Sequence, residues 1–213
     1  MAKVLIIGAS RGIGLKTVER ALDLGHHVRA FARTIGRTAI SNARLEKYQG
    51  DALVEKDLKL SLRGVDTVIQ CLGLPLRPDL ILKPVCLFSD ATKLLLSSME
   101  QSSAKKLIAV TGFGAGDSKT SISCFQRIPF RLVFGRAYND KSVQEDLIRK
   151  SNLDWIIVRP VVLTNGRQTG QYRVLAEPRE WRNGLISRAD VADFLAQQID
   201  SDDYVRKAPV LAY

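Results

Sequence analysis

Two hydrophobic patterns alternate along the chain. Short runs of consecutive apolar residues predict buried strands, and we expect these at 3–8, 27–33, 44–51, 66–73, 105–116, 154–163 and 208–213. Between them, apolar residues recur every three or four positions, as they do on one face of a helix. This second pattern predicts helices at 12–25, 53–64, 87–103 and 139–151, and a short strand followed by a helix within 185–200.

The alternation of these elements indicates the fold class. Strands separated by helices pair in parallel through right-handed crossovers, and nearly all-apolar strands are typical of a sheet covered on both faces. A length of 213 residues suits one α/β domain. We therefore predict a Rossmann-type, doubly wound parallel sheet in a single domain, 1–213, with a small C-terminal substrate-side extension.

The least regular stretch is 117–137, which is apolar and basic together. It is either a loop and helix folded over the edge of the sheet or a flap over a substrate. We expect the substrate-side elements of the domain at about 113–137 and 163–185.

The charge balance favours anionic partners. The chain has 32 Lys and Arg against 22 Asp and Glu, a net charge of +10. A phosphorylated cofactor or an acidic small molecule fits such a balance. The basic residues are spread along the chain instead of being gathered in one arm or helix, so we do not expect nucleic acid as a partner.

Cysteine and histidine usage argues against several kinds of site. Cys71, Cys86 and Cys124 form no C-x-x-C pair, and their odd number indicates a reducing compartment and no metal site. His26 and His27 are adjacent, between a predicted helix and strand, so a lone catalytic histidine is not expected. No apolar run reaches the roughly 20 residues that span a bilayer. The first strand begins at the third residue, without room for a signal peptide, so we expect a cytoplasmic protein without a membrane partner.

A glycine cluster, "GASRGIG" at 8–14, follows the first predicted strand and opens a helix. In parallel α/β sheets, ligands bind at the carboxyl ends of the strands, and glycines there let the backbone approach a pyrophosphate. The following helix offers unpaired N–H groups and the positive end of its dipole. The turn therefore predicts a dinucleotide cofactor.

The charges near this turn favour NADP(H) over NAD. An NAD site usually has an acidic residue about 20 positions on, which binds the ribose hydroxyls. Here the second strand ends in "AFAR", at Arg33, with no acid, and Arg11 lies inside the turn. Arginine binds a 2′-phosphate well. Arg37 either assists or is an ordinary solvated charge.

Several motifs together resemble a known family. They are "GASRGIG" at 8–14, "GDA" at 50–52, "CLG" at 71–73, "VTGFGA" at 110–115, "SNLDWIIVRPVVLTNGRQTGQYRV" at 151–174 and "ISRADVADFL" at 186–195. The chain resembles the atypical short-chain dehydrogenase/reductases of the NmrA-like group. Within that group it is most similar to the flavin and biliverdin-IXβ reductases, which implies a monomer and a planar hydride acceptor such as FMN, FAD or biliverdin.

The resemblance also implies roles for matching positions. The cofactor would be held by Gly8, Ser10, Arg11, Gly12, Ile13, Gly14, Arg33, Asp51, Ala52, Leu72, Gly73, Thr111, Gly112, Lys141, Pro160, Val161, Val162 and Leu163. For Val161 and Val162, plain core packing is an equal alternative.

The chain departs from the catalytic pattern of the wider superfamily, a serine after the fifth strand and Tyr-x-x-x-Lys on the next helix. Gly112 stands where the serine is expected, and Ala137 stands four residues before Lys141. Tyr138 is one position out of register, about 100° around a helix, and would point toward the cofactor if the helix began later, near Asn139. Candidate catalytic residues are thus Thr111, Lys141 and Tyr138, with Lys141 alternatively a surface charge.

Candidate substrate residues lie beyond the fifth strand. Phe113 could stack on a flat ring. Arg167, Arg173 and Arg188 could attract phosphate or propionate groups, although each is individually also a plausible surface charge. Two functions follow as hypotheses. One is an NADPH-dependent reductase of flavins, biliverdin or quinones, and the other is a non-catalytic NmrA-like sensor of the NADP redox state. A nucleotide-sugar epimerase is disfavoured because little chain follows the sixth strand.

Overall fold

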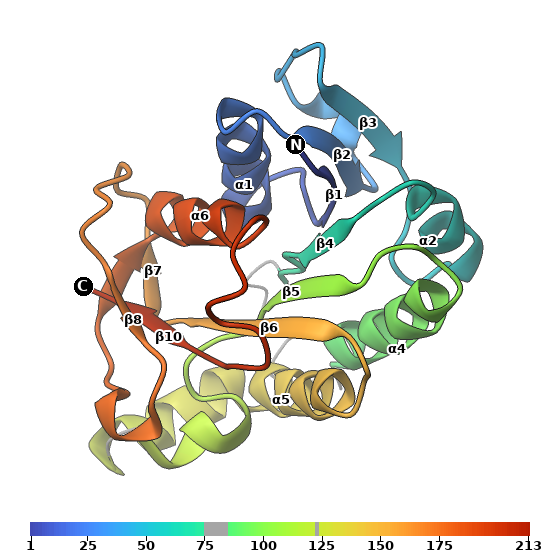
Figure 1. Ribbon diagram of the computed structural model, residues 1–213. Helices are drawn as coiled ribbons and strands as arrows, with labels where there is room; N and C mark the ends of the chain where they lie inside the picture. The colour runs from blue at the N-terminus through green and yellow to red at the C-terminus, as the bar shows by residue number, and fades with distance from the viewer. Residues whose placement is uncertain (75–84, 122–123) are drawn as a thin grey trace.

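The fold is known from a computed structural model, which describes residues 1–74, 85–121 and 124–213, with side chains of 120–134 outside the description. An eight-stranded sheet in the order β3-β2-β1-β4-β5-β6-β10-β8 forms its centre (Figure 1). The strands are β1 Lys3–Ile7, β2 His27–Ala32, β3 Leu45–Gln49, β4 Thr67–Gln70, β5 Lys106–Val110, β6 Asp154–Pro160, β8 Arg173–Leu175 and β10 Val210–Ala212. All neighbours pair in parallel except β8, which runs antiparallel to β10.

Helices cover both faces of this sheet. On one face α1 (Gly12–Asp23) packs against α6 (Arg188–Gln197). On the other lie α2 (Glu55–Ser61), α4 (Leu87–Glu100) and α5 (Cys124–Arg149), as Figure 1 shows. The predicted Rossmann-type, doubly wound sheet is confirmed.

The strand residues divide between two hydrophobic cores, one under each helical layer. In β1, Val4 and Ile6 pack toward α1 and α6, whereas Leu5 and Ile7 pack toward α2 and α4. This alternation follows from the two-residue period of a strand, whose successive side chains point to opposite faces. It explains why the predicted strands read as continuous apolar runs.

The structure differs from the prediction mainly beyond β5. The expected helix 139–151 begins instead at Cys124, so most of 117–137 is helix, preceded by a 3₁₀ turn at Gly116–Ser121. The prediction failed because Pro129 and Gly135 are helix-breaking residues, yet α5 runs through both. The flap interpretation of this stretch lies partly outside the described residues.

Pro160 closes the sixth strand, and the chain then enters a second, two-stranded sheet. This sheet pairs β7 (Val162–Thr164) with β9 (Leu185–Ser187) in parallel. Pro160 within the apolar run 154–163 marks the end of β6, as expected from the sequence, whereas the second sheet was not predicted. The two short strands carry the chain from the carboxyl end of β6 into α6.

Candidate functional site

The glycine turn after β1 is built on close backbone contacts. Gly8 has φ +85°, and a Cβ on it would lie 2.5 Å from the carbonyl oxygen of Cys71 at the end of β4. A Cβ on Gly14 would lie 2.3 Å from the carbonyl oxygen of Gly8. A side chain at Gly8 would therefore push the turn away from β4, and a side chain at Gly14 would push α1 away from the turn.

The start of α1 has room for an anion. Gly12 has φ +58°, and among the described residues no atom lies within 4 Å of where its Cβ would be. Arg11, the residue that precedes the first turn, makes no side-chain cap there, and that turn contains no acidic residue. Because the first N–H groups of a helix lack intrahelical partners, this end of α1 fits the pyrophosphate of a dinucleotide. Ser10 and Ile13 flank it, both half-buried.

Three arginines surround the carboxyl ends of β1 and β2. Arg11 follows β1, Arg33 follows β2, and Arg37 ends a 3₁₀ turn at Ile35–Arg37; all three are exposed. On the neighbouring strand, Asp51 follows β3, and its Oδ1 accepts a hydrogen bond from the Leu53 N–H at 3.0 Å. The region thus offers positive charge beside the turn and a carboxylate one strand further out.

Other predicted cofactor residues lie along the same edge of the sheet. Ala52 is buried, Leu72 is half-buried at the end of β4 and Gly73 is exposed. Beyond β6, Val161 is buried in the core while Val162 is 56% exposed. Their N–H groups donate to the carbonyls of Leu211 and Gly184, so the backbone donors at this point already have partners within the protein. Leu163 packs, half-buried, against the core.

Thr111, the first residue after β5, has hydrogen-bond partners for its hydroxyl, its N–H and its carbonyl. Its side chain is buried, and its hydroxyl donates to Glu145 Oε1 at 2.7 Å. Its backbone N–H donates to the Val158 carbonyl of β6, and its own carbonyl accepts a hydrogen bond from Lys141 Nζ. Thr111 therefore joins β5 to β6 and to two side chains of α5.

Tyr138 reaches the same point although it is one position out of the superfamily register. A Cβ on Gly112 would lie 2.8 Å from the Tyr138 hydroxyl oxygen, so this hydroxyl lies over the Gly112 backbone. The late helix start near Asn139, which was expected to let Tyr138 point toward the cofactor, does not occur. Helix α5 begins at Cys124, and Tyr138 still points to the end of β5.

Burial changes the acid–base properties of both side chains. It raises the pKa of Tyr138 to about 12. It lowers the pKa of Lys141 to about 8, a shift that the charges of Glu145 and Asp140 partly oppose. Lys141 Nζ lies 4.8 Å from the centre of the Phe88 ring and 5.8 Å from that of Tyr138. The tyrosine is therefore a neutral hydroxyl at ordinary pH, and the lysine changes charge slightly above neutrality.

A buried ion pair lies behind Thr111. Glu145 and Arg159 are both completely buried, with Nη2 2.5 Å from Oε2 and Nε 3.1 Å from Oε1. Arg159 also pairs with Asp117 and lies over the Trp181 ring, 4.9 Å from its centre. Sequence reasoning missed this pair. The signal was an arginine in the middle of the apolar run "DWIIVRPVVL", together with Glu145 one helical turn after Lys141.

Two carboxylates of α6 hold a loop, residues 165–172, that carries part of the most specific motif. Asp190 accepts hydrogen bonds from the backbone of Thr169 and Gly170, each at 2.8 Å. Asp193 accepts from Gln168 Nε2 at 2.9 Å and from the Tyr172 hydroxyl at 3.1 Å. These bonds join the motifs at 151–174 and 186–195 into one structural unit. We call residues 165–172 the clamped loop.

The predicted substrate residues are not equivalent. Arg167, in the clamped loop, and Arg173, at the start of β8, are exposed. Arg188 instead donates to the Thr164 carbonyl at 3.1 Å and to Asn165 Oδ1 at 2.7 Å, so it supports the chain after β7. Phe113 is 5% exposed and packs in the core, which leaves little of its ring surface for stacking on a ligand.

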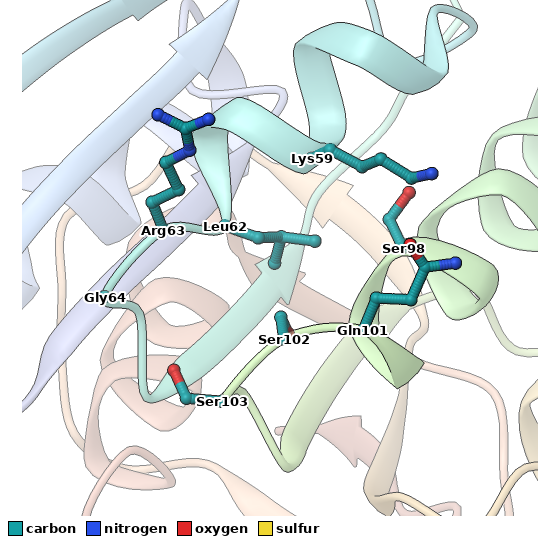
Figure 2. A pocket seen from close by; sticks show the side chains of 8 residues that line it. All are labelled: Lys59, Leu62, Arg63, Gly64, Ser98, Gln101, Ser102 and Ser103. Carbon is teal, nitrogen blue, oxygen red and sulfur yellow. The ribbon is translucent and has the colours of Figure 1, made fainter.

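A pocket at the opposite end of the sheet is separate from all these residues. It has a volume of about 220 Å³ and lies between the C-terminal ends of α2 and α4 (Figure 2). Figure 2 shows Lys59 and Gln101 on one side of it and Arg63 directed away from them. Because parallel α/β sheets bind ligands at their carboxyl ends, we do not assign the cofactor to this pocket.

Comparison with known proteins identifies the family. The profile of the NAD(P)H-binding family matches residues 8–202, from the glycine turn to beyond α6. The chain belongs to this family. The resemblance seen in the motifs is therefore confirmed at the level of a nicotinamide-binding family.

Curated relatives are distant and longer. A chloroplastic, uncharacterised protein of Arabidopsis thaliana is 25% identical over 202 residues, covering 92% of this chain and 71% of that protein. The photosystem II assembly factor Ycf39 of Synechocystis is 21% identical over 214 residues, covering 96% of this chain and 60% of that protein. The chain thus spans 60–71% of the length of these relatives.

Solved structures confirm the fold. The anaerobillin reductase ChuY of Escherichia coli O157:H7 superposes with a TM-score of 0.83 at 23% identity, covering 99% of this chain and 96% of that one. A putative NADH-flavin reductase of Streptococcus pneumoniae gives a TM-score of 0.77 at 22% identity, covering all of both chains. Within the described part of our chain, no helix is long and apolar enough to cross a membrane.

Proposed function

We propose that this protein is an NADPH-dependent reductase that transfers a hydride to a planar conjugated acceptor, a flavin such as FMN or FAD, a biliverdin-type linear tetrapyrrole, or a quinone. One observation carries the proposal: Thr111, Tyr138 and Lys141 meet at the carboxyl end of β5, on the same edge of the sheet as the glycine turn and two strands from it. The likeness in fold to proteins described as anaerobillin and flavin reductases supports it.

The residues around the turn would bind the cofactor. Gly8, Gly12 and Gly14 admit the pyrophosphate to the N-terminus of α1, and Arg11 and Arg33 bind the 2′-phosphate that distinguishes NADPH from NADH. Bound NADPH supplies the hydride. Lys141, held by the Thr111 carbonyl, offers an ammonium group to the ribose side of the cofactor while the pH is below about 8.

The chain has a weak proton donor, and this favours acceptors that need little acid catalysis. With a pKa raised to about 12, Tyr138 holds its proton strongly and releases it poorly. A simple carbonyl needs a proton as the hydride arrives. A flavin or linear tetrapyrrole spreads the added charge over its conjugated system and takes a proton from solvent, so positioning of the acceptor dominates.

The activity is tested with purified protein, NADPH and one acceptor at a time, FMN, biliverdin or a quinone, by following the nicotinamide absorbance near 340 nm. We expect NADPH consumption with at least one of them and a lower rate with NADH. The absence of consumption above background with all three would contradict a reductase of planar acceptors.

A redox sensor is the second candidate, and the high pKa of Tyr138 is the observation that favours it. A sensor would bind NADPH tightly, shown by quenching of protein fluorescence, without consuming it with any acceptor. Cofactor choice is tested separately by Arg33→Ala. We expect this variant to lose affinity for NADPH far more than for NADH, and equal losses would refute the 2′-phosphate role.

A further inference from the structure

The buried Glu145–Arg159 pair is more elaborate than stability requires. Arg159 presents Nε and Nη2 to the two carboxylate oxygens, which is the side-on fork that arginine forms with carboxylates. Burying such a pair costs desolvation energy, and well-packed apolar residues often serve stability equally well. The preceding β6 residues Ile156, Ile157 and Val158 are apolar and buried, so an apolar residue at 159 would continue the pattern.

The chain after β5 is built around this pair. A Cβ on Gly116 would lie 2.2 Å from Glu145 Oε2 and 2.9 Å from Arg159 Nη2, so only glycine fits there with the pair in place. The Gly116 N–H donates to Ser142 of α5, and Asp117 closes the pair on its outer side. The end of β5, α5 and β6 therefore meet at one buried carboxylate.

The pair is linked to Lys141 through Thr111. Glu145 Oε1 accepts from the Thr111 hydroxyl, and the Thr111 carbonyl accepts from Lys141 Nζ. Lys141 and Glu145 are also one turn apart on α5. Arg159 thus fixes Glu145, Glu145 fixes Thr111, and Thr111 fixes the lysine.

We propose that the Glu145–Arg159 pair positions Lys141: it holds Thr111 where its carbonyl receives the lysine, and it fixes the Glu145 carboxylate one helical turn from the ammonium group. Neither residue touches the cofactor in this scheme, so both are positioning residues. The inference rests on the proposed function, in which Lys141 contacts NADPH.

Among the described residues, few charged groups face Lys141. From α5 it meets Asp140, Glu145 and Tyr138, and from α4 it meets the Phe88 ring. Asp140 is already engaged, since it accepts from the Phe88 and Ser89 N–H groups at the start of α4. Burial lowers the pKa of Lys141, and Glu145 opposes this more strongly than Asp140 does. Removal of the Glu145 charge should therefore lower that pKa further.

The test measures the titration of Lys141 directly, without turnover. The full-length protein is dimethylated at lysine with ¹³C-formaldehyde and a reductant, and the Lys141 signal is assigned by its loss in Lys141→Arg. Glu145→Gln keeps the size of the side chain and an oxygen for Thr111. We expect the Lys141 midpoint to move to lower pH in this variant. Asp193→Asn, which removes a buried carboxylate on the other face of the sheet, should leave the midpoint in place.

A second variant covers the case in which Glu145→Gln does not fold. Arg159→Lys keeps the positive charge but cannot make both bonds of the fork. We expect NADPH affinity at pH 7.5 to fall about tenfold or more, because a misplaced lysine loses contact with the cofactor. An unmoved midpoint in folded Glu145→Gln, or unchanged NADPH affinity in folded Arg159→Lys, overturns the proposal. A shifted midpoint in a protein that consumes no NADPH with any acceptor leaves the positioning intact and rejects the reductase.

Discussion

Two buried carboxylates, Glu145 under one helical layer and Asp190 under the other, are stabilised in different ways. Under α4 and α5, Glu145 faces the full charge of Arg159, which is itself completely buried. Under α1 and α6, Asp190 is equally buried but accepts hydrogen bonds from neutral groups, including Thr169, Gly170, Ser187 and the Tyr213 hydroxyl. Glu145 is held by a counter-charge, and Asp190 is held by a set of dipoles; its neighbour Asp193 has the counter-charge of Arg20.

The two arrangements should respond differently when partners of the carboxylate are removed. Burial alone would raise the pKa of Asp190, but hydrogen bonds from Tyr213, Gly170, Thr169 and Ser187 outweigh it and lower that pKa overall. Such a set of hydrogen-bond donors can lose its members one at a time, so the stabilisation of the carboxylate weakens gradually. An ion pair fails as a whole, because the remaining partner is left charged and buried.

The largest expected effect comes from breaking the ion pair. Arg159→Met should lower the free energy of unfolding by about 3–5 kcal/mol, since Glu145 then stays buried without its counter-charge. The double variant with Glu145→Met should recover much of this loss, because no buried charge remains. Urea unfolding followed by circular dichroism measures both, and simple addition of the two losses would show that the pair is not coupled.

Removal of the Asp190 charge should lower the free energy of unfolding by less than removal of Arg159. Asp190→Asn should lower the free energy of unfolding by about 1–3 kcal/mol, since several donors lose a charged acceptor. Hydrogen exchange should rise first in the clamped loop, 165–172, while the amides of β1 and β4 stay protected. Equal acceleration throughout the domain would mean that Asp190 supports the whole fold and not the loop.

The same carboxylate predicts a dependence on pH. Because the pKa of Asp190 is lower in the folded protein, its contribution is fully present above the unfolded value of about 4 and is lost as the pH falls through the folded value. The difference in unfolding free energy between wild type and Asp190→Asn should be constant from pH 7 to about 5 and shrink in stronger acid. A difference that grew in acid would contradict a lowered pKa of Asp190 in the folded protein.

The smallest effect is expected where one donor among several is removed. Tyr172→Phe deletes the hydroxyl bond to Asp193, which retains Arg20, Gln168 and Gln197. We expect a loss of about 0.5–1.5 kcal/mol by urea unfolding. A loss as large as that of Arg159→Met would mean that this face also behaves as a single unit.

The sequence predicted the fold well because the strands carry their signal locally. The run "KVLII" and the glycines at 8, 12 and 14 identify β1, the turn and α1 without reference to distant residues. The start of α5 could not be predicted in this way. Pro129 and Gly135 argue locally against a helix, yet α5 runs through both.

The candidate site was predictable in parts. Thr111, from the motif at 110–115, and Lys141, from the superfamily's catalytic spacing, lie together at the end of β5, but their roles stay predictions. Glu145, Asp190 and Asp193 belong to the site through contacts between elements far apart in the chain. The Arg159–Glu145 pair, for example, depends on where β6 lies against α5, which no local pattern records.

The short distance between Gly112 and Tyr138 fixes the order in which this centre could be redesigned. The missing serine and the shifted tyrosine are a single departure, because a side chain at 112 and the hydroxyl of Tyr138 claim the same space. A route to the superfamily's serine–tyrosine arrangement is therefore simplest when position 138 loses its tyrosine before a serine is placed at 112. A path that begins with Gly112→Ser requires the Tyr138 side chain to shift.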